Sequence, residues 1–171
     1  RFIRFESKVV AAQAMPGQFV HIKVPGLEDS ALRRPFSIFN AEDGVLEVLY
    51  KTVGRGTKVL NNVKTGDDVS VAGPLGRGFP TKCSSTALLV GGGYGVAPLY
   101  FLARKLQCEK ILFTGGRTAA DILGVEQFKA IGVEPVVSTN DGSLGVKGLV
   151  TLPLDEKINE LRKEGKPFEL F

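Results

Sequence analysis

A short run of β-forming residues leads directly into a glycine cluster, and this junction constrains the fold more than any other feature of the chain. Leu88–Val90 is apolar, glycine occupies positions 91, 92, 93 and 95, and the following apolar residues recur at helical spacing to Leu102. Glycine lets backbone pass where a Cβ would collide with a ligand, and a helix start presents unpaired amides. The junction therefore predicts a strand–turn–helix unit that holds a pyrophosphate.

Two other interpretations of this segment need weighing. Residues 86–103 carry no charge, so a transmembrane helix must be considered. Three consecutive glycines at roughly 1 kcal/mol each, and a helix-interior proline at about 3 kcal/mol, argue against such a helix. A glycine turn with only a structural role stays open, because Gly91-x-Gly93-x-x-Val96 departs from the standard dinucleotide fingerprint. Pro98 is expected in the first helical turn, where proline is tolerated.

Composition excludes several classes of function. The 171 residues suit one large domain or two small ones, and the net charge of +4 comes from scattered basic residues, which disfavours a nucleic-acid-binding barrel. Cys83 and Cys108 lack metal-ligand spacing and are predicted to be free thiols, and His21 is the single histidine, so no metal site is expected. His21 is interpreted as a strand side chain. No signal peptide or membrane span is read, which favours the cytoplasm.

The hydrophobic period changes near residue 80. The first half alternates with period two between turn dipeptides such as Pro16-Gly17 and Asp43-Gly44, which predicts a small antiparallel barrel or sandwich. The expected strands are Arg4–Val10, Phe19–Val24, Pro35–Phe39, Val45–Tyr50 and Asp68–Val71.

The second half alternates apolar strands with helical patterns, which predicts a parallel sheet covered by helices. The polar segment Phe79–Thr86 is the expected linker, which places domains at 1–80 and 81–171. The expected strands are Ala87–Val90, Lys110–Phe113, Pro135–Ser138 and Phe168–Phe171, and the expected helices are Val96–Leu106, Ala119–Ala130 and Leu154–Lys163.

Two further segments of the first half favour ligand binding. In Arg33–Ile38 a charged pair precedes a proline-fixed strand start, and a guanidinium suits phosphate, although an exposed arginine pair on a barrel edge explains it equally well. In Leu49–Thr57 a strand ends in Gly-Arg-Gly-Thr, whose amides and hydroxyl suit an anion, and a short helix is expected at Lys58–Asn62. Gly73–Phe79 is interpreted as the turn into the second domain.

Taken in order, these motifs resemble the ferredoxin–NADP reductase superfamily, and within it the electron-transfer subunits of class 1B dihydroorotate dehydrogenases. The motifs that carry the resemblance are Arg34–Ile38, Gly54–Thr57, Gly73–Phe79 and Gly91–Leu99, supported by Pro16–Val20, Phe113–Arg117, Ser138–Gly142 and Gly148–Thr151.

The resemblance implies an antiparallel Greek-key barrel that binds FAD, followed by a parallel-sheet α/β domain that binds NAD(H). Arg34 would contact the FAD pyrophosphate, Ser37 would lie near flavin N5, and Gly56 and Thr57 would bind phosphates. The implied FAD residues are Arg34, Pro35, Phe36, Ser37, Leu49, Tyr50, Lys51, Gly56 and Thr57. The implied dinucleotide residues are Gly91, Gly92, Gly93, Gly95, Gly115, Arg117 and Asp141, with Gly116 and Thr139–Gly142 on the same sheet edge.

Members of the family have a further strand before the one expected at Arg4, and after Phe168–Phe171 they continue into a four-cysteine 2Fe-2S segment. The chain is therefore expected to be a fragment, trimmed at both ends, that does not encode the cluster.

The implied function is that of a flavoprotein electron-transfer subunit that passes reducing equivalents between NAD(H) and a partner through FAD. The expected partner is the dihydroorotate dehydrogenase catalytic subunit of pyrimidine biosynthesis, or a similar acceptor, in a hetero-oligomer. No catalytic acid–base residue is expected, since the cofactors carry the chemistry. The rivals are another NAD(P)H-dependent ferredoxin reductase, a sulfide dehydrogenase-like subunit, and a flavin-binding regulatory domain without turnover. The choice of NADH or NADPH stays open, because no acidic residue follows the second strand and Arg117 lies there.

Overall fold

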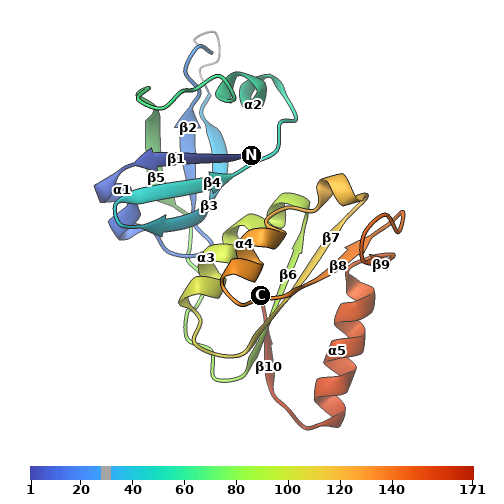
Figure 1. The fold of residues 1–171 in the computed structure, drawn as a ribbon. Coiled ribbons are helices and arrows are strands. Elements are labelled where there is room, and N and C mark those ends of the chain that lie inside the picture. Colours follow the sequence, from blue (N-terminus) through green and yellow to red (C-terminus); the bar gives the residue numbers. More distant parts are fainter. Residues whose placement is uncertain (28–31) are drawn as a thin grey trace. The chain divides into compact units, whose positions relative to one another are not determined.

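A computed structural model describes residues 1–27 and 32–171 of the chain. It divides the chain into two compact units, Arg1–Phe79 and Pro80–Phe171 (Figure 1). The change of unit coincides with the change of hydrophobic period, and the sequence boundary at residue 80 differs from the structural one by a single residue. Residues 79–85, between the last strand of the first unit and the first strand of the second, form neither helix nor strand.

The first unit is an antiparallel, barrel-like sheet with the strand order β1-β4-β3-β2-β5. Strands β2, β3 and β4 follow one another as neighbours, and β5 returns to pair with β2, which is the Greek-key arrangement that the family resemblance implies. The elements are β1 (Phe2–Glu6), α1 (Lys8–Gln13), β2 (Phe19–Lys23), β3 (Arg34–Glu42), β4 (Val45–Leu49), α2 (Arg55–Leu60) and β5 (Ser70–Leu75).

Alternation along the strands builds the core of this unit. Val20 and Ile22 in β2 are fully buried, as are Leu46 and Val48 in β4, while the residues between them reach the surface at least in part. Successive strand side chains point to opposite faces, so each strand contributes every second residue to one core. Phe39 in β3 completes it and meets the ring of Phe2 edge-on, with the centroids 5.1 Å apart.

The expected strand Arg4–Val10 is wrong beyond Glu6, because helix α1 begins at Lys8. The hydroxyl of Ser7 accepts a hydrogen bond from the amide of Val10 at 3.4 Å and caps the first turn. Val10 and Ala11 are then buried on one side of the helix, which packs against β3 and β4. The adjacent residues Val9 and Val10 have a strand propensity. The Ser7 cap and the burial of one helix side favour the helix over that propensity.

The segment Gly73–Leu75 was expected to be a turn, and it belongs instead to strand β5. The register between β2 and β5 shifts between Phe19 and His21, which marks a bulge. Gly73 has φ of 154°, and a Cβ there would lie 2.8 Å from the side chain of Val20, so the glycine lets the two strands approach at the bulge. Glycine signals a close approach here rather than the end of the strand.

The second unit is a five-stranded parallel sheet in the order β10-β6-β7-β8-β9, as the alternating pattern predicts. Figure 1 shows α3 and α4 on one face and α5 on the other. The elements are β6 (Thr86–Gly92), the 3-10 turn η1 (Gly93–Val96), α3 (Ala97–Lys105), β7 (Lys110–Gly116), the 3-10 turn η2 (Ala119–Asp121), α4 (Val125–Ala130), β8 (Pro135–Thr139), β9 (Val146–Lys147), α5 (Thr151–Lys163) and β10 (Phe168–Leu170).

Each face of the parallel sheet has its own apolar layer. Leu88 and Phe113 pack with Leu154 and Leu161 of α5 on one side. On the other side Tyr100 of α3 meets Phe128 of α4 edge-on, with ring centroids 5.4 Å apart. Burial on both faces explains why β6 reads as a continuous apolar run rather than an alternating one.

Three helical boundaries differ from those expected. The run Val96–Leu106 starts as η1 and becomes α3 at Ala97, with Pro98 in the first turn as predicted. The run Ala119–Ala130 is broken into η2 and α4, because Gly124 adopts a left-handed φ of 74°. Helix α5 begins at Thr151, three residues before the expected start. The two-residue strand β9 is too short to leave a periodic signal in the sequence.

Candidate functional site

In the first unit, the start of β3 lies against the start of α2. A Cβ on Gly56 would come within 3.4 Å of Nε of Arg34 and 3.6 Å of its Cγ, so the guanidinium stem rests directly on the glycine backbone. Arg34 also donates from Nη1 to the carbonyl of Leu32 at 2.9 Å. Two residues that stand 22 positions apart in the numbering, Arg34 and Gly56, are therefore brought into contact, as a shared phosphate site requires.

Thr57 shapes the turn that precedes α2. Its hydroxyl oxygen accepts hydrogen bonds from the amides of Val53 at 2.9 Å and Gly54 at 3.1 Å, and it donates to the carbonyl of Gly54 at 3.0 Å. The helix begins at Arg55, three residues before the expected Lys58, and Thr57, its third residue, reaches back with its hydroxyl to the amide of the N-cap Gly54. The hydroxyl that the sequence offers to a ligand is used to hold the backbone around Gly56.

Tyr50 joins the end of β4 to the end of α2. Its buried phenol donates to Oδ1 of Asn61 at 2.9 Å, and Nδ2 of Asn61 donates to Oγ1 of Thr52 at 2.9 Å. Burial raises the pKa of Tyr50, so the phenol stays protonated at neutral pH and keeps its role as donor. The ring meets Phe36 edge-on with the centroids 5.9 Å apart. Asn61 and Thr52 carry no motif, and sequence reasoning missed both.

The remaining predicted residues of this unit differ in exposure. Phe36 and Leu49 are buried, Ser37 and Lys51 are half-buried, and Pro35 is exposed. Because β3 lies between β2 and β4, these positions belong to one end of neighbouring strands. We refer to the nine residues as the β3–α2 cluster; they are Arg34, Pro35, Phe36, Ser37, Leu49, Tyr50, Lys51, Gly56 and Thr57.

The adjacent arginine has a different role. Arg33 donates from Nη1 to the carbonyl of Ser70 at 2.9 Å and from Nη2 to its hydroxyl at 2.9 Å. These two bonds attach the residue before β3 to the first residue of β5. Arg33 therefore links two strands, whereas Arg34 contacts α2. The sequence alone does not reveal this difference between the two adjacent arginines.

In the second unit, the carboxyl ends of β6, β7 and β8 meet at one edge. Gly91 pairs with Thr114 and Gly92 with Gly115, while Gly116 pairs with Thr139. Open parallel sheets bind ligands at this edge. We refer to it as the glycine edge; it comprises Gly91–Gly95, Gly115–Arg117 and Thr139–Gly142.

The glycines of this edge fall into two groups. A Cβ on Gly91 would lie 2.8 Å from the backbone of Val96, one on Gly115 would lie 2.8 Å from Cβ of Val150, and one on Gly116 would lie 2.8 Å from Cβ of Asp121. These three glycines are needed for packing. By contrast, no atom lies within 4 Å of a Cβ on Gly93 or Gly95, and one on Gly92 would have only the carbonyl of Gly115 at 3.9 Å. Backbone is open to an incoming ligand at these three positions.

Two loops join beside the open glycines. The amide of Asp141 donates to the carbonyl of Arg117 at 3.2 Å, and the amide of Ala119 donates to the hydroxyl of Ser143 at 2.8 Å. The carboxylate of Asp141 accepts from the hydroxyl of Ser143 at 2.6 Å and from its amide at 3.0 Å, and these bonds lower the pKa of Asp141. Asp141 is thus an exposed, ionised carboxylate on the glycine edge.

Arg117 is also exposed, and its Nε lies 3.8 Å from Oδ2 of Asp121. Just inside the edge, the hydroxyls of Thr114 and Ser138 are buried with no hydrogen-bond partner in the structure. Sequence reasoning singled out neither hydroxyl for a role, because a single Thr or Ser in a buried strand has no distinguishing pattern.

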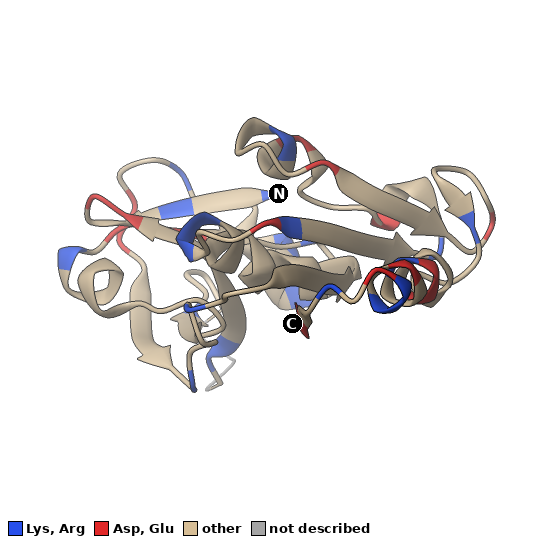
Figure 2. Ribbon diagram, turned by 90° about the horizontal axis from the view of Figure 1, so that it is seen from below, with Lys and Arg blue, Asp and Glu red and all other residues tan. Residues whose placement is uncertain are grey.

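Two broader expectations concern metals and charge. Within residues 1–27 and 32–171, no group of three or more His, Cys, Asp or Glu side chains is placed to hold a metal ion. In Figure 2, the basic residues of the described part are spread over both units with acidic residues among them, rather than gathered into one stripe. None of the helices in this described part combines the length and apolarity of a membrane span.

Known proteins match both units. Residues 2–79 match the family described as oxidoreductase FAD-binding domain. The electron transfer subunit of dihydroorotate dehydrogenase B (NAD(+)) from Desulforamulus reducens is 41% identical over 155 residues, which cover 87% of this chain and 59% of the relative. The subunit of the same name from Fusobacterium nucleatum is 43% identical over 145 residues, covering 80% and 55%. The chain therefore spans less than two thirds of the length of these relatives.

Solved structures show the same fold. A structure of the NADH-dependent reduced ferredoxin-NADP oxidoreductase superposes with a TM-score of 0.77 at 33% identity, over 96% of this chain and 59% of that one. The Amycolatopsis cytochrome P450 reductase superposes with a TM-score of 0.69 at 28% identity, over 92% and 52%. Residues 2–79 therefore belong to the oxidoreductase FAD-binding domains, and the chain has the ferredoxin reductase-like fold and is a homologue of the dihydroorotate dehydrogenase B electron-transfer subunits.

Proposed function

We propose that the chain is the FAD- and NAD-binding part of a flavoprotein subunit that passes reducing equivalents between NAD(H) and a partner dehydrogenase. The observation that carries this proposal is the 41% identity over 155 residues, which extends through both units, to a protein named as a dihydroorotate dehydrogenase B electron transfer subunit. The proposed partner is the dihydroorotate-oxidising subunit, in a cytoplasmic hetero-oligomer. Bound FAD would supply the redox chemistry, and the protein would supply binding and orientation.

The β3–α2 cluster fits FAD. Arg34 places a guanidinium beside the backbone of Gly56 at the start of α2, and a charged fork next to backbone amides suits a pyrophosphate. Thr57 keeps that backbone in place through its hydrogen bonds. The hydrogen bond from Tyr50 to Asn61 fixes the ring of Tyr50, which meets Phe36 edge-on. Pro35 and Ser37, which are exposed and half-buried respectively, are the proposed contacts for the isoalloxazine.

The glycine edge fits a nicotinamide dinucleotide. Gly92, Gly93 and Gly95 leave space at the carboxyl end of β6, where a pyrophosphate can approach backbone. Asp141, on the neighbouring loop, supports NAD(H) over NADP(H), since an ionised carboxylate binds ribose hydroxyls and repels a 2′-phosphate. Asp141→Asn should lower the ratio of the NADPH dissociation constant to the NADH dissociation constant. An unchanged ratio would show that Asp141 does not belong to the proposed site.

The test of the flavin site compares two neighbouring arginines. Arg34→Ala should weaken FAD binding by about 10- to 100-fold, since a charge-assisted hydrogen bond contributes roughly 1.5–3 kcal/mol. Arg33→Ala removes the same charge, and we expect it to leave FAD affinity within about twofold, because Arg33 contacts Ser70 instead. Affinity is read from flavin fluorescence, and the released flavin is identified by mass. Equal losses in both variants, or recovery of FMN alone, would contradict the proposal.

Turnover distinguishes this function from that of a regulatory flavin-binding domain. With FAD bound, anaerobic addition of NADH should bleach the flavin absorbance, whereas a domain without turnover would keep its colour.

A second candidate, a subunit of an NADH-dependent ferredoxin–NADP reductase, is favoured by the TM-score of 0.77 at 33% identity. When NADH is absent and a dihydroorotate-oxidising subunit is added, reduction of the flavin should depend on dihydroorotate, and reduction only by reduced ferredoxin would favour the second candidate.

A further inference from the structure

The two cysteines of the second unit lie at the amino edge of the parallel sheet, opposite to the glycine edge. Cys83 stands three residues before β6 begins at Thr86, and Cys108 stands two residues before β7 begins at Lys110. These strands are neighbours, with Ala87 paired to Lys110. Because parallel neighbours start at the same edge, the two segments that carry the cysteines enter the sheet side by side.

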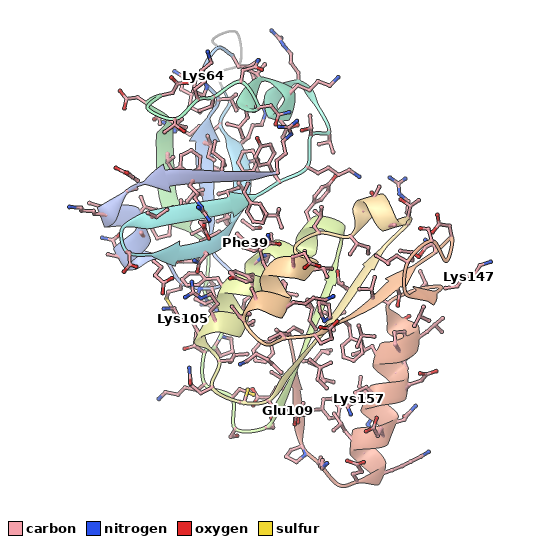
Figure 3. The ribbon with its side chains drawn as sticks, viewed as in Figure 1. Phe39, Lys64, Lys105, Glu109, Lys147 and Lys157 are labelled. Atoms are coloured by element: carbon pink, nitrogen blue, oxygen red, sulfur yellow. The ribbon has the colours of Figure 1, made fainter. Side chains whose placement is uncertain are left out.

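Hydrogen bonds hold both segments at this edge. The amide of Ala87 donates to the carbonyl of Glu109 at 2.8 Å, and the hydroxyl of Thr86 donates to the carboxylate of the same glutamate at 3.1 Å. On the other side, the hydroxyl of Ser85 donates to the carboxylate of Glu169 in β10 at 3.1 Å. Figure 3 labels Glu109 at this edge.

The two sulfur atoms are neighbours. Burial raises the pKa of the Cys108 thiol first, and the adjacent thiol of Cys83 raises it further. Cys83 donates its thiol hydrogen to the carbonyl of Ser85 at 3.1 Å, and both cysteines are free and half-exposed. Residues 79–85 have no regular structure, so Cys83 can shift toward Cys108 without breaking a strand or helix.

Metal binding does not explain the pair. A structural zinc site needs about four ligands, and within residues 1–27 and 32–171 no third His, Cys, Asp or Glu completes a metal-binding group. Two adjacent, partly exposed thiols are suited instead to exchange with a disulfide.

We propose that Cys83 and Cys108 form a reversible disulfide that ties the start of β6 to the start of β7, with a low-molecular-weight disulfide such as oxidised glutathione as the oxidant. The Cys83 thiolate attacks one sulfur of the oxidant, whose S–S bond breaks and releases one thiol. The Cys108 thiolate then attacks the Cys83 sulfur of the mixed disulfide and releases the second thiol. The protein loses two electrons and two protons, and the oxidant gains both.

This bond would close a loop over residues 84–107, which hold β6, η1 and α3. Closing a loop restricts the unfolded chain, so the oxidised form should open less often in this segment. The inference does not depend on the proposed function, because it concerns the edge opposite to the glycine edge and needs no bound cofactor.

The experiment equilibrates the full chain in glutathione buffers of increasing oxidising ratio. The bonds are then mapped by mass spectrometry without reduction. The wild-type chain should lose both free thiols together and yield a peptide pair linked through Cys83 and Cys108, with no glutathione retained. Cys83→Ser and Cys108→Ser serve as matched controls, and each should retain one glutathione on its remaining cysteine. Glutathione retained on both cysteines of the wild-type chain, or disulfides only between molecules, would overturn the proposal.

Hydrogen exchange tests the consequence of the bond. Amides of residues 86–105 should exchange severalfold more slowly in the oxidised chain than in the reduced one, and neither serine variant should show the difference. Identical exchange in linked and reduced wild-type chains would show that the bond does not brace this segment, and that part of the proposal would be wrong.

Discussion

Gly91 has no room for a side chain, because a Cβ there would lie 2.8 Å from both Cα and the amide nitrogen of Val96. We expect Gly91→Ala to lower the free energy of unfolding by about 1–3 kcal/mol, since neighbouring backbone must move to accept the methyl group. Denaturation in urea, followed by circular dichroism, measures the change.

Gly95 provides the control for Gly91. A Cβ at Gly95 would meet no atom within 4 Å, and the residue does not need a left-handed φ. Gly95→Ala should therefore leave the free energy of unfolding within about 0.5 kcal/mol of the wild-type value, and it should weaken NADH binding if the glycine edge holds the dinucleotide. If both variants lost the same stability, the division of the glycines into packed and open groups would be incorrect.

The second prediction at the scale of single residues concerns Asp141. Its pKa is lowered by hydrogen bonds from the hydroxyl and amide of Ser143. A carboxyl whose pKa is lowered by folding stabilises the fold above its unfolded-state pKa, and that stabilisation is lost as the pH falls through the folded-state pKa. Ser143→Ala removes the hydroxyl bond and should raise the pKa of Asp141 toward that of an ordinary exposed aspartate. Carbon-detected NMR titration measures the shift, and an unchanged pKa would show that the Ser143 hydroxyl does not contribute to the lowering.

The sequence predicted which residues have groups suited to a ligand, but it did not predict which contacts those residues make within the fold. It singled out Gly91 and Gly95 for the same reason, yet only one is open to a ligand. It also assigned the Thr57 hydroxyl to phosphate binding, and it did not indicate that this hydroxyl accepts hydrogen bonds from the amides of Val53 and Gly54 at the start of α2. Such tasks depend on residues distant in the chain, which local patterns do not contain.

Among the elements, α2 depends on one hydroxyl. Thr57→Ala leaves the amides of Val53 and Gly54 without their acceptor, and we expect a loss of about 1 kcal/mol in the free energy of unfolding, the net contribution of a typical hydrogen bond. The looser turn should also weaken FAD binding, because Gly56 lies within it. Thr57→Ser keeps the hydroxyl and should retain most of both properties. Equal stability of the alanine and serine variants, measured by urea denaturation, would show that the cap contributes nothing.

Element types were predictable wherever the hydrophobic period extended over several residues. Strand β4 and helix α5 are examples, since a period of two or of 3.6 records burial directly. The failures occurred where a local bond or an unusual φ decided the outcome: the Ser7 cap starts α1, and Gly124 divides the helical run after β7. A strand as short as β9 is fixed by its pairing with β8 rather than by its own residues.

At the scale of the whole molecule, each of the two candidate sites lies within one of the two units. All nine residues of the β3–α2 cluster belong to Arg1–Phe79, and the entire glycine edge belongs to Pro80–Phe171. The division follows from sequence, because each unit has its own hydrophobic period and therefore its own core. It implies that each ligand stabilises mainly the unit that binds it.

Hydrogen exchange of the full chain tests this implication. A ligand at 100 times its dissociation constant stabilises the unit that binds it by about 2.7 kcal/mol, which corresponds to roughly 100-fold slower exchange through global opening. FAD should protect amides at residues 34–37 and 49–57, and NAD⁺ should protect those at residues 91–95, 115–117 and 139–142. At the same FAD concentration, Arg34→Ala should reduce the slowing in the first pattern from roughly 100-fold to about 2- to 10-fold and keep the second pattern, which separates loss of a ligand contact from unfolding of the chain. Protection by FAD confined to residues 80–171 would place the flavin in the other unit and reject the assignment of the β3–α2 cluster.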